Sequence, residues 1–293
     1  MAEETALKTY RGNCHCAAFV YEVELPEIKG YTECNCSICH KKGYAWLGPM
    51  EEGLLRFVKG SKDELAVYTF GSGSLSHRFC AHCGTAVLGD HAKMKPGLLL
   101  NARTIQDLDI WSLNVSTFDG KALPPPREPP VYSGPEPTAT VENGKIYHGS
   151  CHCGAVKVAL KLKPLETYDL SNDDEQIVDC NCSICTRGAY IWIYPHKDQS
   201  VVQGREHLSY RIFGYGIERK AFCKHCGVHI CNEPSELTDE EYERLDDYGK
   251  EERSRVINNR NFTLRILDDF DCSTLKTQRL DGWNDMPGAY VNP

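Results

Sequence analysis

The chain has 293 residues, of which 41% are hydrophobic and 25% are charged, and its formal net charge at pH 7 is −8. This length suits two domains of roughly 130–150 residues better than one. The acidic balance and the lack of a basic stripe argue against a nucleic-acid partner, since phosphate neutralisation supplies most of that affinity. No run approaches the ~18 consecutive apolar residues of a membrane helix.

The amino-terminal residues MAEETALKTYRG are acidic and polar, unlike a secretory signal.

The cysteine content indicates metal binding. Sixteen cysteines are present, and all but Cys231 and Cys272 lie in C-x-C, C-x2-C or C-x-C-x2-C groups. In a reducing compartment such clusters are more typical of metal ligands than of disulfides. We therefore expect a soluble, metal-binding, intracellular protein of the cytoplasm or also of the nucleus, with no membrane partner.

Short strands dominate the first half. Apolar and polar residues alternate over residues 17–25 (AAFVYEVEL) and 65–70 (LAVYTF), which is typical of half-buried strands. Residues 43–49 and 98–105 are also β-like. Seven prolines follow between Lys121 and Thr140, and they indicate an extended connector over about 121–142. We expect a first domain over 1–135.

The second half, expected as a domain over 143–293, repeats this pattern. Strand-like stretches recur at 155–162, 189–195 and 254–267. An acidic segment, 233–255, interrupts them with ten acidic against four basic residues. Thr238 and Glu241 there predict a capping box that opens a short helix in a solvated insertion. The fold class is therefore mainly β in both halves.

The cysteine motifs themselves are duplicated in the same order. YRGNCHCAAFVYEV, from Tyr10, matches YHGSCHCGAVKVAL, from Tyr147, and FCAHCGTAV, from Phe79, matches FCKHCGVHI, from Phe222. CNCSIC occurs twice, and the pair Asp119–Gly120 recurs as 281–282. The sequence is therefore a tandem repeat of two similar halves, with loop insertions between the matched motifs.

Spacing suggests how the seven cysteines of each copy divide. The C-x-C pair presents two thiolates on one face of a strand, and the C-x2-C pair has zinc-knuckle spacing. Together the pairs make a closed structural zinc site in each copy, from Cys14, Cys16, Cys80 and Cys83, and from Cys151, Cys153, Cys223 and Cys226. Three cysteines per copy then remain: Cys34, Cys36 and Cys39, and Cys180, Cys182 and Cys185.

Three protein ligands and an open fourth position are typical of catalytic zinc, whereas structural sites are closed. We expect these six cysteines to be catalytic, with two Zn²⁺ per domain and four per chain. A three-thiolate site is soft and suits an incoming thiolate. Such a site favours chemistry on a small thiol, which adds to a carbonyl or is eliminated from an adduct.

Two alternatives remain open at this point. His40 could close the first three-cysteine site, although the second copy has Thr186 at that position. The pairing could instead join Cys36 and Cys39 to Cys80 and Cys83, which leaves Cys14, Cys16 and Cys34. The histidines between cysteines are expected to be surface residues or to support the ligands from outside: His15, His82, His152 and His225.

The motifs GNCHCAAFVYEV…CNCSICHKKG…FCAHCG and GSCHCGAVKVAL…CNCSICTRG…FCKHCG resemble those of the glutathione-dependent formaldehyde-activating enzyme family, which includes centromere protein V. The resemblance covers both halves and implies two tandem β-tent zinc-binding domains. It also implies the preferred pairing, a structural four-cysteine zinc and a second, open zinc in each domain. Asn35 and Asn181 stand where many members have histidine, and Ala17 replaces a usual glycine.

The function expected first is a zinc-dependent carbon–sulfur lyase similar to S-(hydroxymethyl)glutathione synthase, whose partners are a small thiol such as glutathione and an aldehyde or related electrophile. An enzyme for a larger thioether or secondary metabolite and a non-enzymatic zinc-structured interaction module are the alternatives. Arg103 and Arg260 align between the copies without a clear role. Charged and aromatic residues that align beside the third cysteine are candidates for binding the thiol substrate: Lys41, Arg187, Tyr44, Trp46, Tyr190 and Trp192.

Overall fold

The structure is a computed structural model that describes residues 6–124, 127–268, 270–286 and 290–293. Contacts within it divide the chain into two compact units. In the described residues, the first unit contains 6–124 and 127, with Ser183–Ala189 and 290–293. The second contains 128–182, 190–268 and 270–286.

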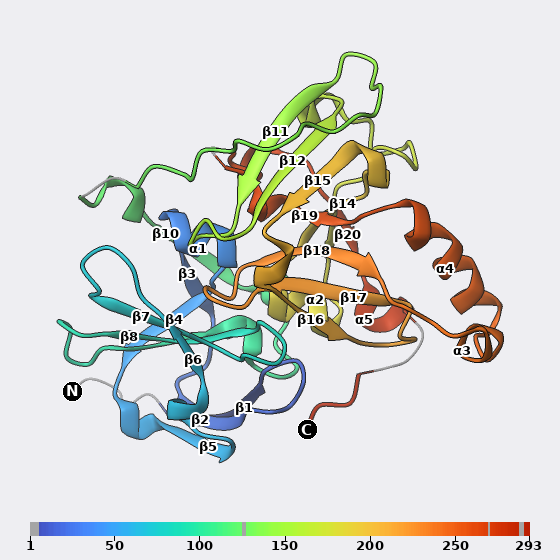
Figure 1. Ribbon diagram of the computed structural model, residues 1–293. Coiled ribbons are helices and arrows are strands. Elements are labelled where there is room, and N and C mark those ends of the chain that lie inside the picture. Colours follow the sequence, from blue (N-terminus) through green and yellow to red (C-terminus); the bar gives the residue numbers. More distant parts are fainter. Residues whose placement is uncertain (1–5, 125–126, 269, 287–289) are drawn as a thin grey trace. The chain divides into compact units, whose positions relative to one another are not determined.

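In the described part of the first unit, ten strands form two sheets (Figure 1). The smaller sheet has the order β1-β2-β5, and the larger has the order β10-β3-β4-β9-β8-β7-β6. β10 runs parallel to β3, while the other described pairs are antiparallel. The strands are β1 (Lys8–Asn13), β2 (Val20–Leu25), β3 (Gly30–Cys34), β4 (Trp46–Met50), β5 (Leu55–Lys59), β6 (Ala66–Tyr68), β7 (Leu75–Phe79), β8 (Ala86–His91), β9 (Leu98–Asn101) and β10 (Asn114–Phe118).

The second unit repeats this topology strand for strand. Its small sheet has the order β11-β12-β15, and its seven-stranded sheet, traced from β20, has the order β20-β13-β14-β19-β18-β17-β16. β13 and β20 are again the parallel pair. The strands are β11 (Lys145–Ser150), β12 (Lys157–Leu162), β13 (Val178–Cys180), β14 (Ile191–Ile193), β15 (Ser200–Gln203), β16 (Leu208–Ile212), β17 (Glu218–Cys223), β18 (His229–Pro234), β19 (Phe262–Thr263) and β20 (Gln278–Leu280). The mainly β fold class and its duplication are confirmed.

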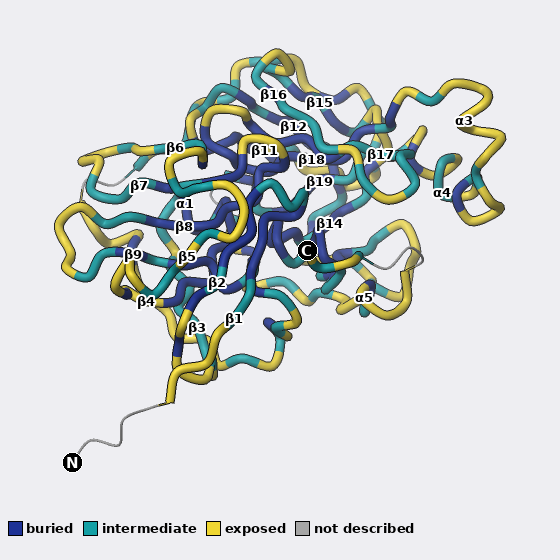
Figure 2. Tube along the Cα trace, turned by 90° about the horizontal axis from the view of Figure 1, so that it is seen from below, coloured by how far each residue is buried: buried dark blue, intermediate teal, exposed yellow. Residues whose placement is uncertain are grey.

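Side-chain alternation explains why these segments form sheets. In β2, Tyr21 and Val23 are fully buried, whereas Glu24 between Val23 and Leu25 is exposed. Figure 2 shows the burial along this strand. Successive side chains of a strand point to opposite faces, so one face of β2 joins the core of the first unit and the other meets water.

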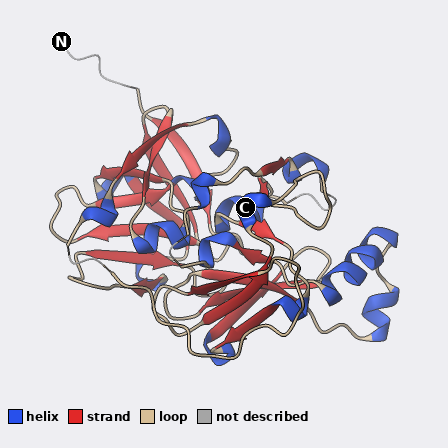
Figure 3. Ribbon diagram, turned by 90° about the horizontal axis from the view of Figure 1, so that it is seen from above, coloured by secondary structure: helices blue, strands red, loops and turns tan. Residues whose placement is uncertain are grey.

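Helices are short in the described residues (Figure 3). They are α1 (Ser37–Lys42), α2 (Ser183–Gly188), α3 (Asp239–Glu243), α4 (Asp247–Asn258) and α5 (Gly282–Asp285). None of the helices in the described part of the chain is long and apolar enough to span a membrane.

The acidic segment carries α3 and α4. The expected capping box is present, since Thr238 Oγ1 accepts from the Glu241 backbone N–H and Glu241 accepts from that of Thr238. The prediction of β structure over 254–267 is wrong at its start, because residues 254–258 form the last turns of α4. Asp246 caps this helix by accepting from Gly249 N–H at 2.7 Å, and the charged helix formers that follow favour the helix over a strand.

From residue 128 on, the proline-rich connector belongs to the second unit, and residues 128–142 form no helix or strand. Residues 125 and 126 lie outside the described part. The Tyr132 ring stacks on His148 at a centroid distance of 4.6 Å. Lys157 Nζ donates to the Val131 carbonyl at 2.7 Å, and Ala139 N–H donates to the Asp198 carbonyl. Prolines reduce the conformational entropy that the segment loses when it becomes ordered. A few such contacts can therefore hold an extended segment in place.

Candidate metal centres

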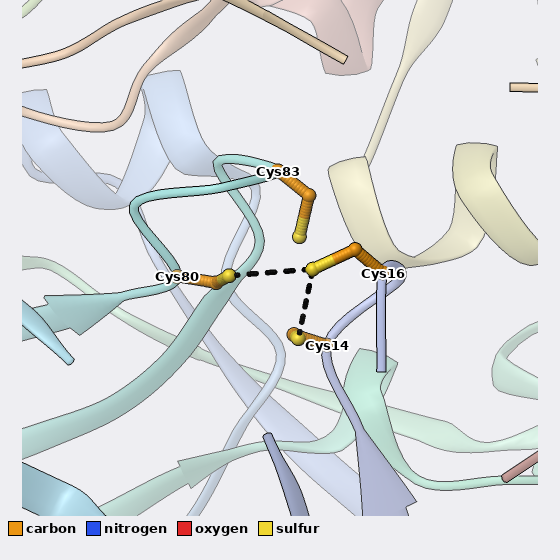
Figure 4. A group of neighbouring side chains, drawn as sticks. All are labelled: Cys14, Cys16, Cys80 and Cys83. Atoms are coloured by element: carbon orange, nitrogen blue, oxygen red, sulfur yellow. Dashed lines mark hydrogen bonds between the residues drawn. The ribbon is translucent and has the colours of Figure 1, made fainter. Parts of the chain in front are cut away.

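The C-x-C and C-x2-C pairs meet in each copy. The sulfurs of Cys14, Cys16, Cys80 and Cys83 all lie within 4.8 Å of one another, and Figure 4 shows them pointing toward a common centre. Cys16 Sγ lies 3.7 Å from Cys14 Sγ and 3.6 Å from Cys80 Sγ. Tetrahedral zinc with bonds of about 2.3 Å spaces its sulfurs roughly 3.8 Å apart, so this donor set fits a zinc ion.

The second copy builds the same group from Cys151, Cys153, Cys223 and Cys226. Its Sγ–Sγ distances are 3.4 Å for Cys151 to Cys153 and 3.6 Å for Cys153 to Cys223. Hydrogen bonding from Cys151 lowers the pKa of Cys153, while the pKa of Cys151 is raised by its bonding to Cys153 and Cys223. Thiols this close do not all ionise unless a cation balances them, which supports the metal assignment.

Tight turns hold the ligands of these four-cysteine groups. Gly84 has a φ of 74° and donates its N–H to the Cys80 carbonyl at 2.8 Å, and Gly227 does the same toward Cys223 with a φ of 68°. The turn after the C-x-C pair also needs a left-handed residue. Gly154 fills it with a φ of 81°, but Ala17 must adopt a φ of 57° in the first copy. The departure at Ala17 is therefore a local strain that leaves the ligands in place.

The three remaining cysteines of each copy also come together. The sulfurs of Cys34, Cys36 and Cys39 lie within 4.8 Å of one another, and so do those of Cys180, Cys182 and Cys185. Among the described residues, no histidine joins either group at that spacing, so His40 is not a fourth member. The grouping also differs from the alternative in which Cys36 and Cys39 pair with Cys80 and Cys83.

Local structure brings the first trio together. Cys34 ends β3, Cys36 is the N-cap residue of α1, and Cys39 lies in the first turn of that helix. The Cys36 N–H donates to Cys34 Sγ at 3.4 Å, and the Trp46 indole N–H donates to Cys39 Sγ at 3.4 Å. Hydrogen bonds from the Cys36 and Cys39 thiols lower the pKa of Cys34 to about 3, and the backbone N–H groups of Cys36 and Gly120 contribute.

A second loop closes over this trio. The side chain of Asn35 donates to Asp119 Oδ1 at 2.8 Å and accepts from the Lys121 N–H at 2.8 Å. This pairing holds Gly120 against the cysteines, where an added Cβ would lie 2.4 Å from Cys34 Sγ. Only glycine allows the loop to approach so closely.

The second copy forms the same arrangement. Asn181 donates to Asp281 Oδ1 at 2.8 Å and accepts from the Trp283 N–H at 2.9 Å. An added Cβ at Gly282 would lie 2.6 Å from Cys180 Sγ. We call each set an Asn–Asp–Gly clamp: Asn35, Asp119 and Gly120 in the first copy, and Asn181, Asp281 and Gly282 in the second.

The aromatic pairs predicted from the repeat are stacked and buried. Tyr44 and Trp46 have a centroid distance of 3.8 Å, and Tyr190 and Trp192 have one of 4.2 Å. Trp46 lies beside the first trio through its bond to Cys39. Their predicted part in substrate binding stays a prediction.

Histidines that the sequence did not single out hold the tyrosines of these pairs. His77 Nδ1 lies 3.2 Å from Tyr44 Oη, and His229 Nδ1 lies 2.7 Å from Tyr190 Oη. They come from non-equivalent strands, β7 and β18, so the sequence repeat carried no signal for them.

The basic residues after the third cysteine are buried. Lys41 is 6% exposed and Arg187 is 4% exposed. Within the first unit, Arg187 donates to the Asn13 carbonyl from Nε at 3.0 Å, to Asn13 Oδ1 from Nη2 at 3.0 Å and to the Ser183 carbonyl from Nη1. Arg103 Nε donates to the Gly43 carbonyl at 2.7 Å, at the end of α1. Steering of an anionic substrate by Lys41 and Arg187 stays a prediction.

The histidines between cysteines do not belong to the metal groups. His15 stacks on Tyr290 at 5.0 Å within the first unit, and His225 Nε2 lies 3.1 Å from His207 Nδ1 at an exposed position. In the described residues the candidate metal groups contain cysteine alone.

Two comparisons relate the chain to known proteins. The family model described as glutathione-dependent formaldehyde-activating enzyme matches residues 9–120 and 146–244. A crystal structure of a Rhodobacter sphaeroides protein matches with 21% identity and a TM-score of 0.31, over 45% of this chain and 97% of that one. The family match covers both copies of the cysteine motifs and most of the chain. The chain therefore belongs to the glutathione-dependent formaldehyde-activating enzyme family and carries the family's domain twice.

Proposed function

We propose that the protein is a zinc-dependent carbon–sulfur lyase that joins a small thiol of the glutathione type to an aldehyde, or releases it from the adduct. The observation that carries this proposal is the contrast within each copy between a four-cysteine group and a three-cysteine group. Both fit zinc by donor chemistry, but only the group of three leaves a tetrahedral position for another ligand. Zinc bound there would supply a soft acceptor that favours a thiolate near neutral pH.

The chain's own groups prepare the three-cysteine set for an incoming anion. Three thiolates on a divalent ion leave a net charge of −1, which opposes a fourth thiolate. Donors to sulfur offset this charge: Cys36 N–H to Cys34 Sγ, and the Trp46 indole N–H to Cys39 Sγ. Hydrogen bonds from outside a ligand set tune a metal site in this manner.

Exposure differs among the three cysteines. Cys34 and Cys36 are half-buried, whereas Cys39 is buried beside Trp46. In the second copy Cys182 is the half-buried member. A ligand from solvent would therefore approach on the side of Cys36 and Cys182, while the buried cysteine and the clamp keep the set rigid.

The reaction proposed is an addition. The carbon–sulfur bond forms as the carbonyl π bond breaks, and the thiol proton is transferred to the carbonyl oxygen. The product is a hemithioacetal, which for formaldehyde is the S-hydroxymethyl derivative of the thiol. The reverse reaction breaks the same carbon–sulfur bond and regenerates thiol and aldehyde. No oxidant or reductant is needed in either direction.

The test is an exchange assay with glutathione and formaldehyde on zinc-replete protein, read by NMR line broadening or by two-dimensional exchange spectroscopy. We expect exchange above the uncatalysed rate, and we expect its loss in the double variant Cys36→Ser, Cys182→Ser. Lys145→Met, an exposed lysine over Tyr147, is the matched surface control. Exchange no faster than in buffer, with all four zinc sites loaded, would contradict the proposal for these substrates and favour a larger thioether.

A further inference from the structure

A short helix from the sequence of the second copy belongs to the first unit. This helix, α2, carries Cys185 of the second three-cysteine group, and residues Ser183–Ala189 are part of the first compact unit. Its Arg187 is buried. Burying a guanidinium is costly unless polar partners replace the lost water, so the partners of Arg187 show what holds the helix.

Arg187 bonds to the residue that precedes the first C-x-C pair. Its Nε donates to the Asn13 carbonyl and its Nη2 to Asn13 Oδ1, each at 3.0 Å. Nη1 donates to the Ser183 carbonyl at 3.2 Å, one turn back in α2, and Nη2 donates to Asn292 Oδ1 at 3.1 Å. The planar guanidinium thus joins the helix to residues 13–16, which we call the C-x-C loop of the first copy.

The other end of α2 meets the same loop. Ser183 Oγ lies 3.5 Å from Nε2 of His15, the residue inside the C-x-C pair. The His15 N–H donates to Thr85 Oγ1 at 3.2 Å, and that oxygen lies 3.2 Å from Cys83 Sγ. Both ends of the helix are therefore held by the loop that supplies two cysteines of the first four-cysteine group.

Tyr290 packs against this junction, also within the first unit. Its ring stacks on His15 at a centroid distance of 5.0 Å, and the Arg187 guanidinium carbon lies 5.1 Å from the same ring centroid. Tyr290 Oη donates to the His15 carbonyl at 2.9 Å and accepts from Asn13 Nδ2 at 2.8 Å. An aromatic face attracts a cation, so the ring stabilises the guanidinium where it bonds to the loop.

The charge of Arg187 also fits a metal in the first four-cysteine group. In the part of the chain that the structure describes, the polar partners of this guanidinium are neutral oxygens and include no carboxylate. Burial lowers the pKa of Arg187, whereas the negative charges of Cys14 and Cys83 act in the opposite direction. Four thiolates on one divalent ion leave a net negative charge, so a loaded closed site would favour the guanidinium at this place.

We propose that Arg187 is a positioning residue for the second three-cysteine site, because it fixes α2, and with it Cys185, to the C-x-C loop of the first copy. The closed site of one copy then supports the open site of the other. The hydrogen bonds of Arg187 do not reach β3 or α1, which carry the first three-cysteine group, so that group does not depend on it. This inference rests on the proposed function, because it concerns the assembly of the same kind of centre.

The test titrates glutathione into cobalt-substituted, full-length protein and reads binding from the thiolate-to-cobalt absorption. Cys36→Ser leaves the second open site to be measured, and Cys182→Ser leaves the first. Arg187→Met should raise the Kd of glutathione about tenfold at the second site and leave the Kd at the first unchanged. Arg56→Met, which replaces an exposed arginine of β5 in the first unit, is the matched control and should change neither.

Asn13→Ser provides an independent variant, because the second copy has Ser150 at the aligned position of its own C-x-C motif. This change removes the acceptor at Asn13 Oδ1 but keeps the carbonyl, so the Kd at the second site should rise about threefold. Combined with Arg187→Met it should add little, since both changes act through one contact. Arg187→Lys keeps the charge without the planar fork, so it should recover only part of the binding.

Equal weakening of both open sites by Arg187→Met would overturn the proposal, because that result marks a general structural role. An unchanged Kd at the second site would overturn it as well, measured in Arg187→Met or, if that variant does not fold, in Asn13→Ser.

The proposed function can fail separately. If glutathione leaves the cobalt spectrum of both open sites unchanged in protein with wild-type Arg187, the proposed function fails for this thiol. The role of Arg187 is then decided by the release of cobalt from each three-cysteine group to a chelator. Faster release from the second group alone in Arg187→Met supports the positioning role, and equal release from the two groups overturns it.

Discussion

Gly120 lies so close to Cys34 that a Cβ atom on the glycine would be 2.4 Å from the cysteine Sγ. The two residues are far apart in sequence, and they meet because Asn35 binds both sides of the Asp119–Gly120 turn. The contact recurs between Gly282 and Cys180. The candidate open site is therefore enclosed on one side by a loop whose only tolerated residue at the contact is glycine.

Gly120→Ala should disrupt the first three-cysteine site while leaving the four-cysteine site intact. The added methyl group meets Cys34 Sγ and also Cys36 Cβ, at 3.0 Å, so the loop or the cysteines must move. We expect zinc content to fall by one ion per chain, measured by mass spectrometry of the metal. Gly53→Ala, where an added Cβ meets nothing within 4 Å, is the matched control. Full zinc retention by Gly120→Ala would show that the contact does not shape the site.

The Asn–Asp–Gly clamp should slow the release of zinc from the first three-cysteine site. Asn35→Ala removes hydrogen bonds to Asp119 and to the Lys121 N–H at a solvent-exposed position, which should cost about 0.5–1.5 kcal/mol. Zinc transfer from the first three-cysteine site to a chelator should accelerate roughly tenfold, followed with a colorimetric chelator. A double-mutant cycle with Asp119→Ala should show coupling. Additive effects of the two changes would argue against the clamp.

The two kinds of cysteine group should respond differently to loss of a ligand. Cys83→Ser removes a buried ligand from a closed site, so the free energy of unfolding should fall by about 3 kcal/mol or more. Cys36→Ser places a better N-cap residue at the half-buried start of α1, so stability should change by less than about 1 kcal/mol while activity is lost. Chemical denaturation of both variants decides this, and equal losses would mean that both groups are structural.

Ala17→Gly should stabilise the first domain. Ala17 has a φ of 57°, in a region that costs a non-glycine residue roughly 1–2 kcal/mol, and Gly154 fills the equivalent turn. After the larger chain entropy of glycine is subtracted, a gain of about 0.5–1 kcal/mol is expected. Gly154→Ala should destabilise the second domain by a larger amount, because an added Cβ would also lie 2.9 Å from Pro130 Cγ. Thermal unfolding of the two variants measures these changes in stability. A less stable Ala17→Gly protein or a more stable Gly154→Ala protein would contradict this account of the turn.

Much of this architecture was predictable because the repeat and the cysteine spacings are local signals. Alternation located β2, and the C-x-C and C-x2-C pairs identified the members of the four-cysteine groups. The clamp was not predicted, since the link between Asn35 and Asp119 joins segments brought together only by the parallel pairing of β3 and β10.

Residues 254–258 were assigned wrongly because their β-branched residues obscured the helix that Asp246 caps. The burial of Lys220 against three aromatic rings was not predicted either. A lysine in a strand is usually at the surface, and its burial depends on Phe213, Tyr190 and Trp192 converging from three segments.

The central claim is that each copy holds a second metal at a three-cysteine site with room for another ligand. The most direct measurement is the zinc content of freshly prepared, metal-replete, full-length protein, combined with zinc X-ray absorption before and after addition of glutathione. We predict close to four zinc ions per chain, one for each cysteine group, and a rise in average sulfur coordination when the thiol is added. Two zinc ions per chain, with a spectrum that glutathione leaves unchanged, would contradict the account.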